Sequence, residues 1–192
     1  MTKSDMRWRR TERNLMQAFG DAFKEKPVDR ISVTALSREA DINKATFYLH
    51  YRDVYDLAEA YVRHQARESV ERMDYLDEFF SDPKAFAAHF VDDIDRNDDI
   101  IRPIVERSFL PLFMDQLTQS LSDRLTDLNR GHSDDLFEQI MLTFIVNGFL
   151  SATARFAKSD RETLVTVSGH MLAGIREYGE RHFGPPQQST ID

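Results

Sequence analysis

The chain has 192 residues, 41% of them hydrophobic and 30% charged, which is typical of a globular protein and excludes a disordered one. It contains no cysteine, which excludes disulfides, thiolate metal sites and cysteine-based redox sensing. The net charge of −8 is unevenly divided: residues 1–67 hold 13 Lys and Arg against 10 Asp and Glu (+3), and residues 68–192 hold 12 against 23 (−11).

The first element predicted along the chain is a helix from about Met6 to Lys24. Apolar residues at spacings of three and four, with only seven Gly and six Pro in the chain, predict an all-α fold of about nine helices. The inward face of this first helix is formed by Leu15, Met16, Phe19, Ala22 and Phe23. Four arginines precede or open the helix, and such an arm can lie along phosphates or reach into a minor groove; they are Arg7, Arg9, Arg10 and Arg13. The alternative is that these arginines are ordinary surface residues.

Residues 32–51, SVTALSREADINKATFYLHY, predict two short helices joined by a tight turn. Ser32 is a suitable N-cap for the first helix, and Asn43 is a suitable N-cap for the second. Asp41 stands at the turn, where Asp tolerates a left-handed backbone better than most residues. Together these signals predict a helix-turn-helix, whose second helix commonly enters the DNA major groove. The alternative is a solvated helix pair in an unrelated bundle.

The second of these helices, with its N-cap Asn43, carries the residues expected to contact DNA. Lys44 and Thr46 can reach base edges or neighbouring phosphates, and Ala45 permits close approach and contact with a thymine methyl. Thr34, near the N-terminus of the preceding helix, is expected to meet the DNA backbone, since helix N–H groups favour anions. Phosphate attraction is local, because charges are screened beyond about 10 Å at moderate salt. The acidic remainder of the chain therefore does not prevent the basic N-terminal part from binding DNA.

Two stretches in this part of the chain resemble the DNA-binding domain of TetR-family transcriptional regulators. They are RRTERNLMQAFGDAF, followed after a short loop by ISVTALSREA, and INKATFYLHYRDVYDLAEA, and the resemblance covers residues 9–62. It implies that Tyr48 and His50 contact phosphates. Phe47 and Tyr51, by contrast, are interpreted as core residues. The chain departs from the family where a turn Gly is replaced by Asp41 and a following Lys by Val54; Arg52 is close enough to supply the missing phosphate contact.

The rest of the chain is predicted to form a helical body over residues 53–183, after a DNA-binding domain over residues 1–52. One helix is expected from near Asp53 to about Phe80, and Asp82 before Pro83 marks a new helix start. Pro103 and Pro111 are expected to break the following segment. Further helices are predicted from Leu112 to Leu128, over 133–158, and from a capping box of Ser159 and Glu162 to about residue 182. The tail 184–192 is predicted to be disordered.

The last two predicted helices carry apolar residues on more than one face, with small residues such as Gly148 that allow close helix approach. A helix that is apolar on all sides is expected to be buried on both, and the TetR resemblance also implies a homodimer through these helices. The residues predicted at this interface are Phe149, Ala152, Leu164, Val167, Met171 and Leu172. The alternative is an interior helix of a monomer.

The TetR resemblance also implies an effector cavity in the body. Its candidate lining residues are Phe109, Phe113, Met114, Phe137, Met141 and Phe144, and its candidate polar anchors are Arg102, Arg107 and His89. Aromatic and Met residues at helical spacing are also what a plain core contains, so core packing is the alternative for each of them. The sequence identifies no effector.

Catalytic, metal-binding and cofactor motifs are not recognisable in the sequence, so we expect a protein that is not an enzyme and has no cofactor. No apolar run approaches the roughly 20 residues needed to cross a bilayer, and no signal-peptide core is visible, so we expect a cytoplasmic protein without membrane contact. The leading hypothesis is a dimeric, ligand-responsive repressor that binds an inverted-repeat DNA operator. The alternative is a helical adaptor that acts mainly through a protein partner.

Overall fold

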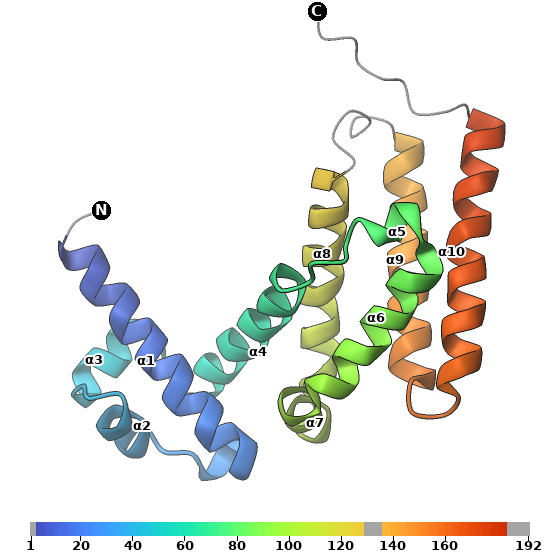
Figure 1. Cartoon of the computed structure of the whole chain (residues 1–192). Helices are drawn as coiled ribbons and strands as arrows, with labels where there is room; N and C mark the ends of the chain where they lie inside the picture. Colours follow the sequence, from blue (N-terminus) through green and yellow to red (C-terminus); the bar gives the residue numbers. More distant parts are fainter. Residues whose placement is uncertain (1–2, 129–135, 184–192) are drawn as a thin grey trace, which may run out of the picture. The chain divides into compact units, whose positions relative to one another are not determined.

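The computed structural model describes residues 3–128 and 136–183, and within these ranges the chain folds into ten α-helices and one short 3-10 helix, without strands (Figure 1). The all-α fold predicted from the sequence is therefore confirmed. The helices in chain order are α1 (Lys3–Glu25), α2 (Val33–Glu39), α3 (Lys44–His50), α4 (Val54–Glu71), α5 (Glu78–Ser81), α6 (Pro83–Arg96), α7 (Asp98–Glu106), α8 (Leu110–Leu128), α9 (Leu136–Phe156) and α10 (Arg161–Phe183). The predicted tail 184–192 lies outside the described residues.

The chain forms two compact units. The first consists of residues 1–66 and 98–113, and the second of residues 67–97 and 114–192. The first unit thus extends beyond the DNA-binding domain predicted over residues 1–52: it includes most of α4, all of α7 and the start of α8.

The first unit has an aromatic core between α1 and α4. Phe19 and Phe23 of α1 stack with ring centroids 5.3 Å apart, and Tyr61 of α4 lies 5.3 Å from Phe19 and 5.8 Å from Phe23. Gly20 permits this close contact, because a Cβ at this position would lie 2.9 Å from Cε2 of Tyr61. Leu36 of α2 and Phe47 of α3 are almost completely buried, so both short helices are anchored by their apolar faces.

Helix α7 belongs to the first unit because it is attached to the C-terminal end of α1. The Lys24 ammonium lies 2.6 Å from the Asp99 carboxylate. Arg107, just after α7, donates hydrogen bonds to the carbonyl oxygens of Lys24 and Lys26 at 3.4 and 3.2 Å, and its guanidinium lies 4.8 Å from the Phe23 ring centroid. A guanidinium here satisfies carbonyls that the end of a helix leaves without partners.

The second unit is built on α6 and α10, with α9 packed against α10. Phe86 and Phe90 of α6 contact Phe149 of α9, with ring centroids 5.5 and 5.0 Å apart. Leu121 and Leu125 of α8 are completely buried. This unit therefore has its own apolar core.

Several predicted helix boundaries were wrong. Helix α4 ends at Glu71 instead of continuing to about Phe80, and a separate short helix, α5, begins at Glu78. Pro103 lies inside α7, where it is buried, instead of breaking the segment. The break predicted at Pro111 is confirmed, because α7 ends at Glu106 and α8 begins at Leu110; Pro111 lies in the first turn of α8, where N–H groups have no partner within the helix.

The predicted capping box at the start of α10 was also wrong. Asp160, and not Ser159, is the residue whose carboxylate accepts the hydrogen bond from the backbone N–H of Thr163, at 3.0 Å. This hydrogen bond is the main cause that lowers the pKa of the Asp160 carboxyl below its ordinary value. The helix consequently begins at Arg161.

The contact between α6 and α10 yields a stability prediction at Gly169. A Cβ there would lie 2.8 Å from Cα of Lys84, which is backbone and cannot rotate away. We expect Gly169→Ala to lower the free energy of unfolding by about 1–3 kcal/mol, although Ala favours helix more than Gly does. Gly174→Ala is the matched control, because nothing in the structure lies within 4 Å of the added Cβ. Urea denaturation should show Gly169→Ala as the less stable variant, and equal midpoints would contradict the prediction.

Candidate nucleic-acid interface

The turn between α2 and α3 is formed by local hydrogen bonds that the sequence predicted. The Ser32 hydroxyl accepts a hydrogen bond from the backbone N–H of Ala35 at 3.2 Å, which caps α2. Asp41 has φ of 56°, the left-handed conformation expected for the turn residue. The N–H of Ile42 then donates to the carbonyl of Ser37 at 2.9 Å, so the end of α2 is closed by a Schellman-type bond. The two helices are therefore joined by a defined turn.

Asp41 provides a test of this turn. A residue with a side chain is strained in the left-handed region and Gly is not, so we expect Asp41→Gly to raise the free energy of unfolding by about 0.5–1 kcal/mol. Asp41→Val should lower it, because a β-branched residue is a genuine outlier at positive φ. In thermal unfolding, the midpoint temperature should be highest for the Gly variant, intermediate for the wild type with Asp, and lowest for the Val variant. A Val variant as stable as the wild type would contradict the assignment.

Helix α3 is positioned by one cap and one buried ring. The Asn43 side chain accepts hydrogen bonds from the backbone N–H of Thr46 at 2.7 Å and from its hydroxyl at 3.0 Å. Phe47 is completely buried, and its ring lies 6.1 Å from that of Tyr51, which is also buried, as predicted for both residues. The cap fixes where the helix begins, and Phe47 fixes which face is turned inward.

The outward face of α3 consists of the residues expected to meet DNA. Lys44, Ala45 and Tyr48 are exposed, and Tyr48 shows 58% of its surface to solvent. Thr46 is half-buried, and its hydroxyl is used in the Asn43 cap. Thr34 on α2 is exposed as well. The first unit therefore presents a cation, a small side chain and a phenol on one short helix.

The N-terminal arginines lie on a helix and not on an extended arm. Helix α1 already begins at Lys3, earlier than the predicted start at about Met6. The four arginines are exposed on its first three turns: Arg7, Arg9, Arg10 and Arg13. Their helical placement favours contact with a phosphate backbone over insertion into a groove.

Arg52, the residue expected to replace a missing lysine, is 84% exposed just before α4. Its guanidinium donates a hydrogen bond to the Asp56 carboxylate at 3.2 Å, and its backbone N–H donates to the same group at 2.9 Å. These two hydrogen bonds hold the pKa of the Asp56 carboxyl below its ordinary value. Arg52 is therefore accessible to a phosphate, which would compete with Asp56 for it.

His50 is the DNA-contact candidate that the structure places differently. Its side chain is only 2% exposed, and its Nδ1 lies 2.8 Å from a carboxylate oxygen of Glu12 on α1. The hydroxyl of Tyr51 donates to the other oxygen of the same carboxylate. Burial, followed by this hydrogen bond, raises the pKa of the Tyr51 phenol, so the phenol keeps its proton. The expected phosphate contact of His50 does not fit this enclosed position.

The candidate effector residues are divided between the two units. Phe109 and Phe113 belong to the first unit, where the Phe109 ring lies 5.9 Å from that of Phe23. Met114 and Met141 belong to the second unit and are half-buried, whereas Phe144 is 74% exposed. The side chain of Phe137 lies outside what the structure describes.

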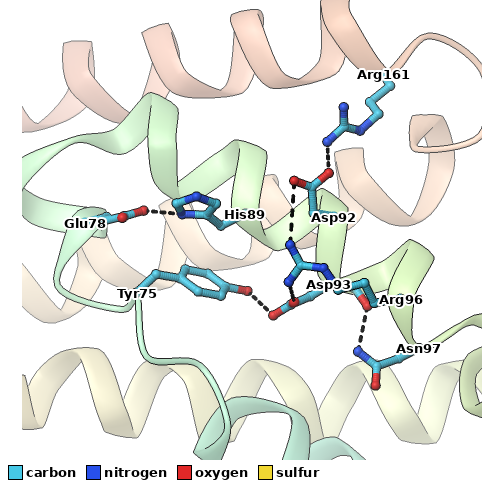
Figure 2. Close-up of polar contacts among 8 residues, drawn as sticks. All are labelled: Tyr75, Glu78, His89, Asp92, Asp93, Arg96, Asn97 and Arg161. Carbon is cyan, nitrogen blue, oxygen red and sulfur yellow. Dashed lines mark hydrogen bonds and ion pairs between the residues drawn. The ribbon is translucent and has the colours of Figure 1, made fainter.

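The candidate polar anchors are already engaged with other groups. Arg102 pairs with Asp98 at 3.6 Å, and Arg107 is bound to the end of α1. The Nδ1 of His89 lies 2.7 Å from the Glu78 carboxylate (Figure 2). Any effector that used these groups would have to displace their present partners.

A polar network surrounds His89 on α6 (Figure 2). The Tyr75 hydroxyl donates to Asp93 at 2.6 Å, and Asp93 also pairs with Arg96 at 2.7 Å. Asp92 pairs with Arg161 at the start of α10. Burial and the Asp93 hydrogen bond raise the pKa of the Tyr75 phenol. These contacts tie the surface of α6 to the chain before α5 and to α10, which is a structural role.

The residues predicted at a dimer interface fall into two groups. Phe149, Leu164 and Leu172 are buried within the second unit, and Ala152 is half-buried. Val167 and Met171 of α10 are exposed. Further exposed apolar residues, which were not predicted at the interface, include Leu136, Ile140 and Phe144, spaced four residues apart on α9.

Within the described residues, the elements form an all-α fold with a helix-turn-helix in the first unit and a second unit of helices. Comparison of the sequence with protein-family models and with curated proteins gave no match. Among solved structures, the chain is similar to the "Dihydroxyacetone kinase operon activator DhaS", with a TM-score of 0.51 and 16% identity over 88% of this chain and 93% of that chain. At this level of identity the similarity bears on the fold alone.

One further observation concerns membranes. Within the described residues, no helix is both long enough and apolar enough to span a bilayer.

Proposed function

We propose that the protein is a sequence-specific DNA-binding transcriptional regulator that acts as a homodimer on an inverted-repeat operator. The observation that carries this proposal is the outward face of α3. Lys44, Ala45 and Tyr48 are exposed there, while Phe47 on the opposite face is completely buried. A short helix held this way can enter the major groove with its side chains toward base edges and phosphates.

The dimer part of the proposal is supported by exposed apolar residues on α9 and α10. Ile140 and Phe144 on α9, and Val167 and Met171 on α10, are all exposed, although α9 and α10 pack against each other. A surface of this kind on neighbouring helices is typical of a protein–protein contact. A two-fold axis through it would present two α3 helices, matching two half-sites of an inverted repeat.

Regulation by an effector is the finer part of the proposal. An effector that prefers one conformation of the second unit would shift the population toward that conformation. In it, the distance between the two α3 helices of the dimer would not fit the operator. Helix α4 is the transmitter in this scheme, because the boundary between the two units falls within it, after Ala66. We propose repression as the outcome of operator binding. The structurally similar protein is named an operon activator, so a reporter gene under the selected operator should be used to determine the sign.

The proposal is tested by selecting bound duplexes from a random DNA pool and measuring their binding by fluorescence anisotropy. We expect an inverted repeat to be enriched, with half-site centres about one helical turn apart. Its affinity should fall linearly on a log–log plot as the salt concentration rises, because phosphate contacts release counterions. A protein that enriched no duplex at low salt would contradict DNA binding and favour the adaptor function.

A further inference from the structure

The carboxylate of Glu12 joins α1 to the end of α3. One of its oxygens lies 2.8 Å from Nδ1 of His50, and the other accepts a hydrogen bond from the hydroxyl of Tyr51. An ionised carboxylate only accepts hydrogen bonds, so the network assigns a proton to Nδ1 of His50. The two carboxylate oxygens of Glu12 thus hold His50, the last residue of α3, and Tyr51, its C-cap.

Trp8 completes this contact from one helical turn earlier. Its ring stacks on the His50 imidazole, with centroids 3.6 Å apart and planes 21° from parallel. Residues four apart lie on the same face of a helix, so Trp8 and Glu12 approach α3 together. The His50 side chain between them is only 2% exposed, whereas the Glu12 side chain is 36% exposed, and a hydrogen bond to a charged group is stronger than one between neutral groups.

The position of Glu12 is unfavourable for DNA binding if only its charge is considered. It lies among the exposed arginines of α1, on a unit expected to approach phosphates, and it contacts the helix expected to enter the groove. A negative charge near the DNA backbone reduces affinity by repulsion. We therefore expect Glu12 to offset this repulsion by holding His50 and Tyr51, and with them α3, in the position that favours DNA binding.

We infer that Glu12 is a positioning residue for DNA recognition, which fixes the angle of α3 against α1 through His50 and Tyr51. The inference rests on the proposed function, because its benefit is realised only when α3 reads a duplex. His50, in this arrangement, acts on DNA through the orientation of α3 and not through a direct phosphate contact. Tyr51 stays protonated, since burial and the Glu12 hydrogen bond raise its pKa, and so remains a donor.

The charge of Glu12 and its positioning role predict opposite results for Glu12→Gln. If Glu12 were only a surface acid, removing its charge would raise affinity for every duplex. If it positions α3, the variant should bind the selected operator about tenfold more weakly, or about 1.4 kcal/mol, while its binding to non-specific duplex is unchanged or stronger. The matched control is Asp21→Asn, which removes the same charge from an exposed position of α1, where the Asp21 carboxylate accepts hydrogen bonds from Gln17 of the same helix. A gain in operator affinity for Glu12→Gln would overturn the inference.

Tyr51→Phe tests the same contact from the other side, since it removes only the hydroxyl. We expect it to weaken operator binding, and we expect the double variant with Glu12→Gln to be less affected than the product of the two single effects. Coupling of this kind is measured by a double-mutant cycle, and independent effects would contradict the inference.

Hydrogen exchange separates a failure of this inference from a failure of the proposed function. The backbone N–H of Tyr51 donates to the carbonyl of Phe47 at 3.0 Å, so its exchange reports whether the end of α3 is held. Glu12→Gln should speed this exchange several-fold without DNA present, and Asp21→Asn should not. If the wild type bound no duplex, faster exchange in Glu12→Gln would still show that Glu12 holds the end of α3, and only the link to DNA recognition would be rejected. Unchanged exchange in Glu12→Gln would overturn the inference.

Discussion

Exchanging both Lys44 and Tyr48 for Ala should reduce affinity for the selected operator by about a hundredfold or more, which corresponds to about 2.7 kcal/mol. Lys44 is exposed in the first turn of α3, and Tyr48 is 58% exposed one turn later. The first provides a cation for a base edge or phosphate, and the second provides a hydroxyl for a phosphate. Fluorescence anisotropy over a series of salt concentrations should also show a shallower salt dependence, because one phosphate-neutralising charge is missing.

The fold should survive this double exchange. Phe47 remains buried under α3, and the Asn43 cap does not involve either side chain. Lys26→Ala is the matched control, since it removes an exposed lysine of the same unit that is not on α3. If the double variant and the Lys26→Ala control both bound the operator with the affinity of the wild type, α3 would not be the element that reads DNA.

The parts of the fold that the sequence predicted correctly are those determined by neighbouring residues. Ser32 and Asn43 cap helices three residues ahead of the N–H groups that they bind, and Asp41 adopts its left-handed turn within two residues of both helices. Asp82 and Pro83 start α6 in the same local way, with the Asp82 carboxylate accepting from the N–H of Ala85. Local side-chain chemistry is sufficient for such features.

The features that the sequence did not reveal depend on distant residues. His50 is enclosed because Glu12, 38 residues earlier, accepts from it, and no spacing rule connects the two. Helix α7 joins the first unit through Lys24 and Asp99, which are 75 residues apart. The segment after α4 also has a distant partner, because the Tyr75 hydroxyl donates a hydrogen bond to Asp93 on α6. Tertiary contacts of this kind override local patterns.

The last two helices, α9 and α10, show both kinds of feature. Apolar residues on more than one side of them were predicted from the sequence, but periodicity alone did not tell the core side from the exposed side. The structure separates them: Phe149 is buried beside Phe86 and Phe90, whereas Phe144 is 74% exposed. The residues that best test dimerisation are therefore Phe144 and Met171, which is 61% exposed on α10.

Phe144→Asp should convert the proposed dimer into a monomer with an intact second unit. Burying a Phe side chain contributes about 1.5–3 kcal/mol, and a two-fold interface contains the residue twice, so the dimer dissociation constant should rise by about a hundredfold or more. Leu128→Asp on α8 is the matched control, because Leu128 is another exposed apolar residue of the same unit that is outside α9 and α10. Sedimentation velocity should show a monomer only for Phe144→Asp, with a helical circular-dichroism spectrum like that of the wild type. The operator affinity of the Phe144→Asp monomer should also fall, because two linked DNA-binding units bind far more tightly than one. A Phe144→Asp protein that sedimented as a dimer would move the interface elsewhere on the chain, and a wild type that sedimented as a monomer would leave the inverted-repeat operator without its physical basis.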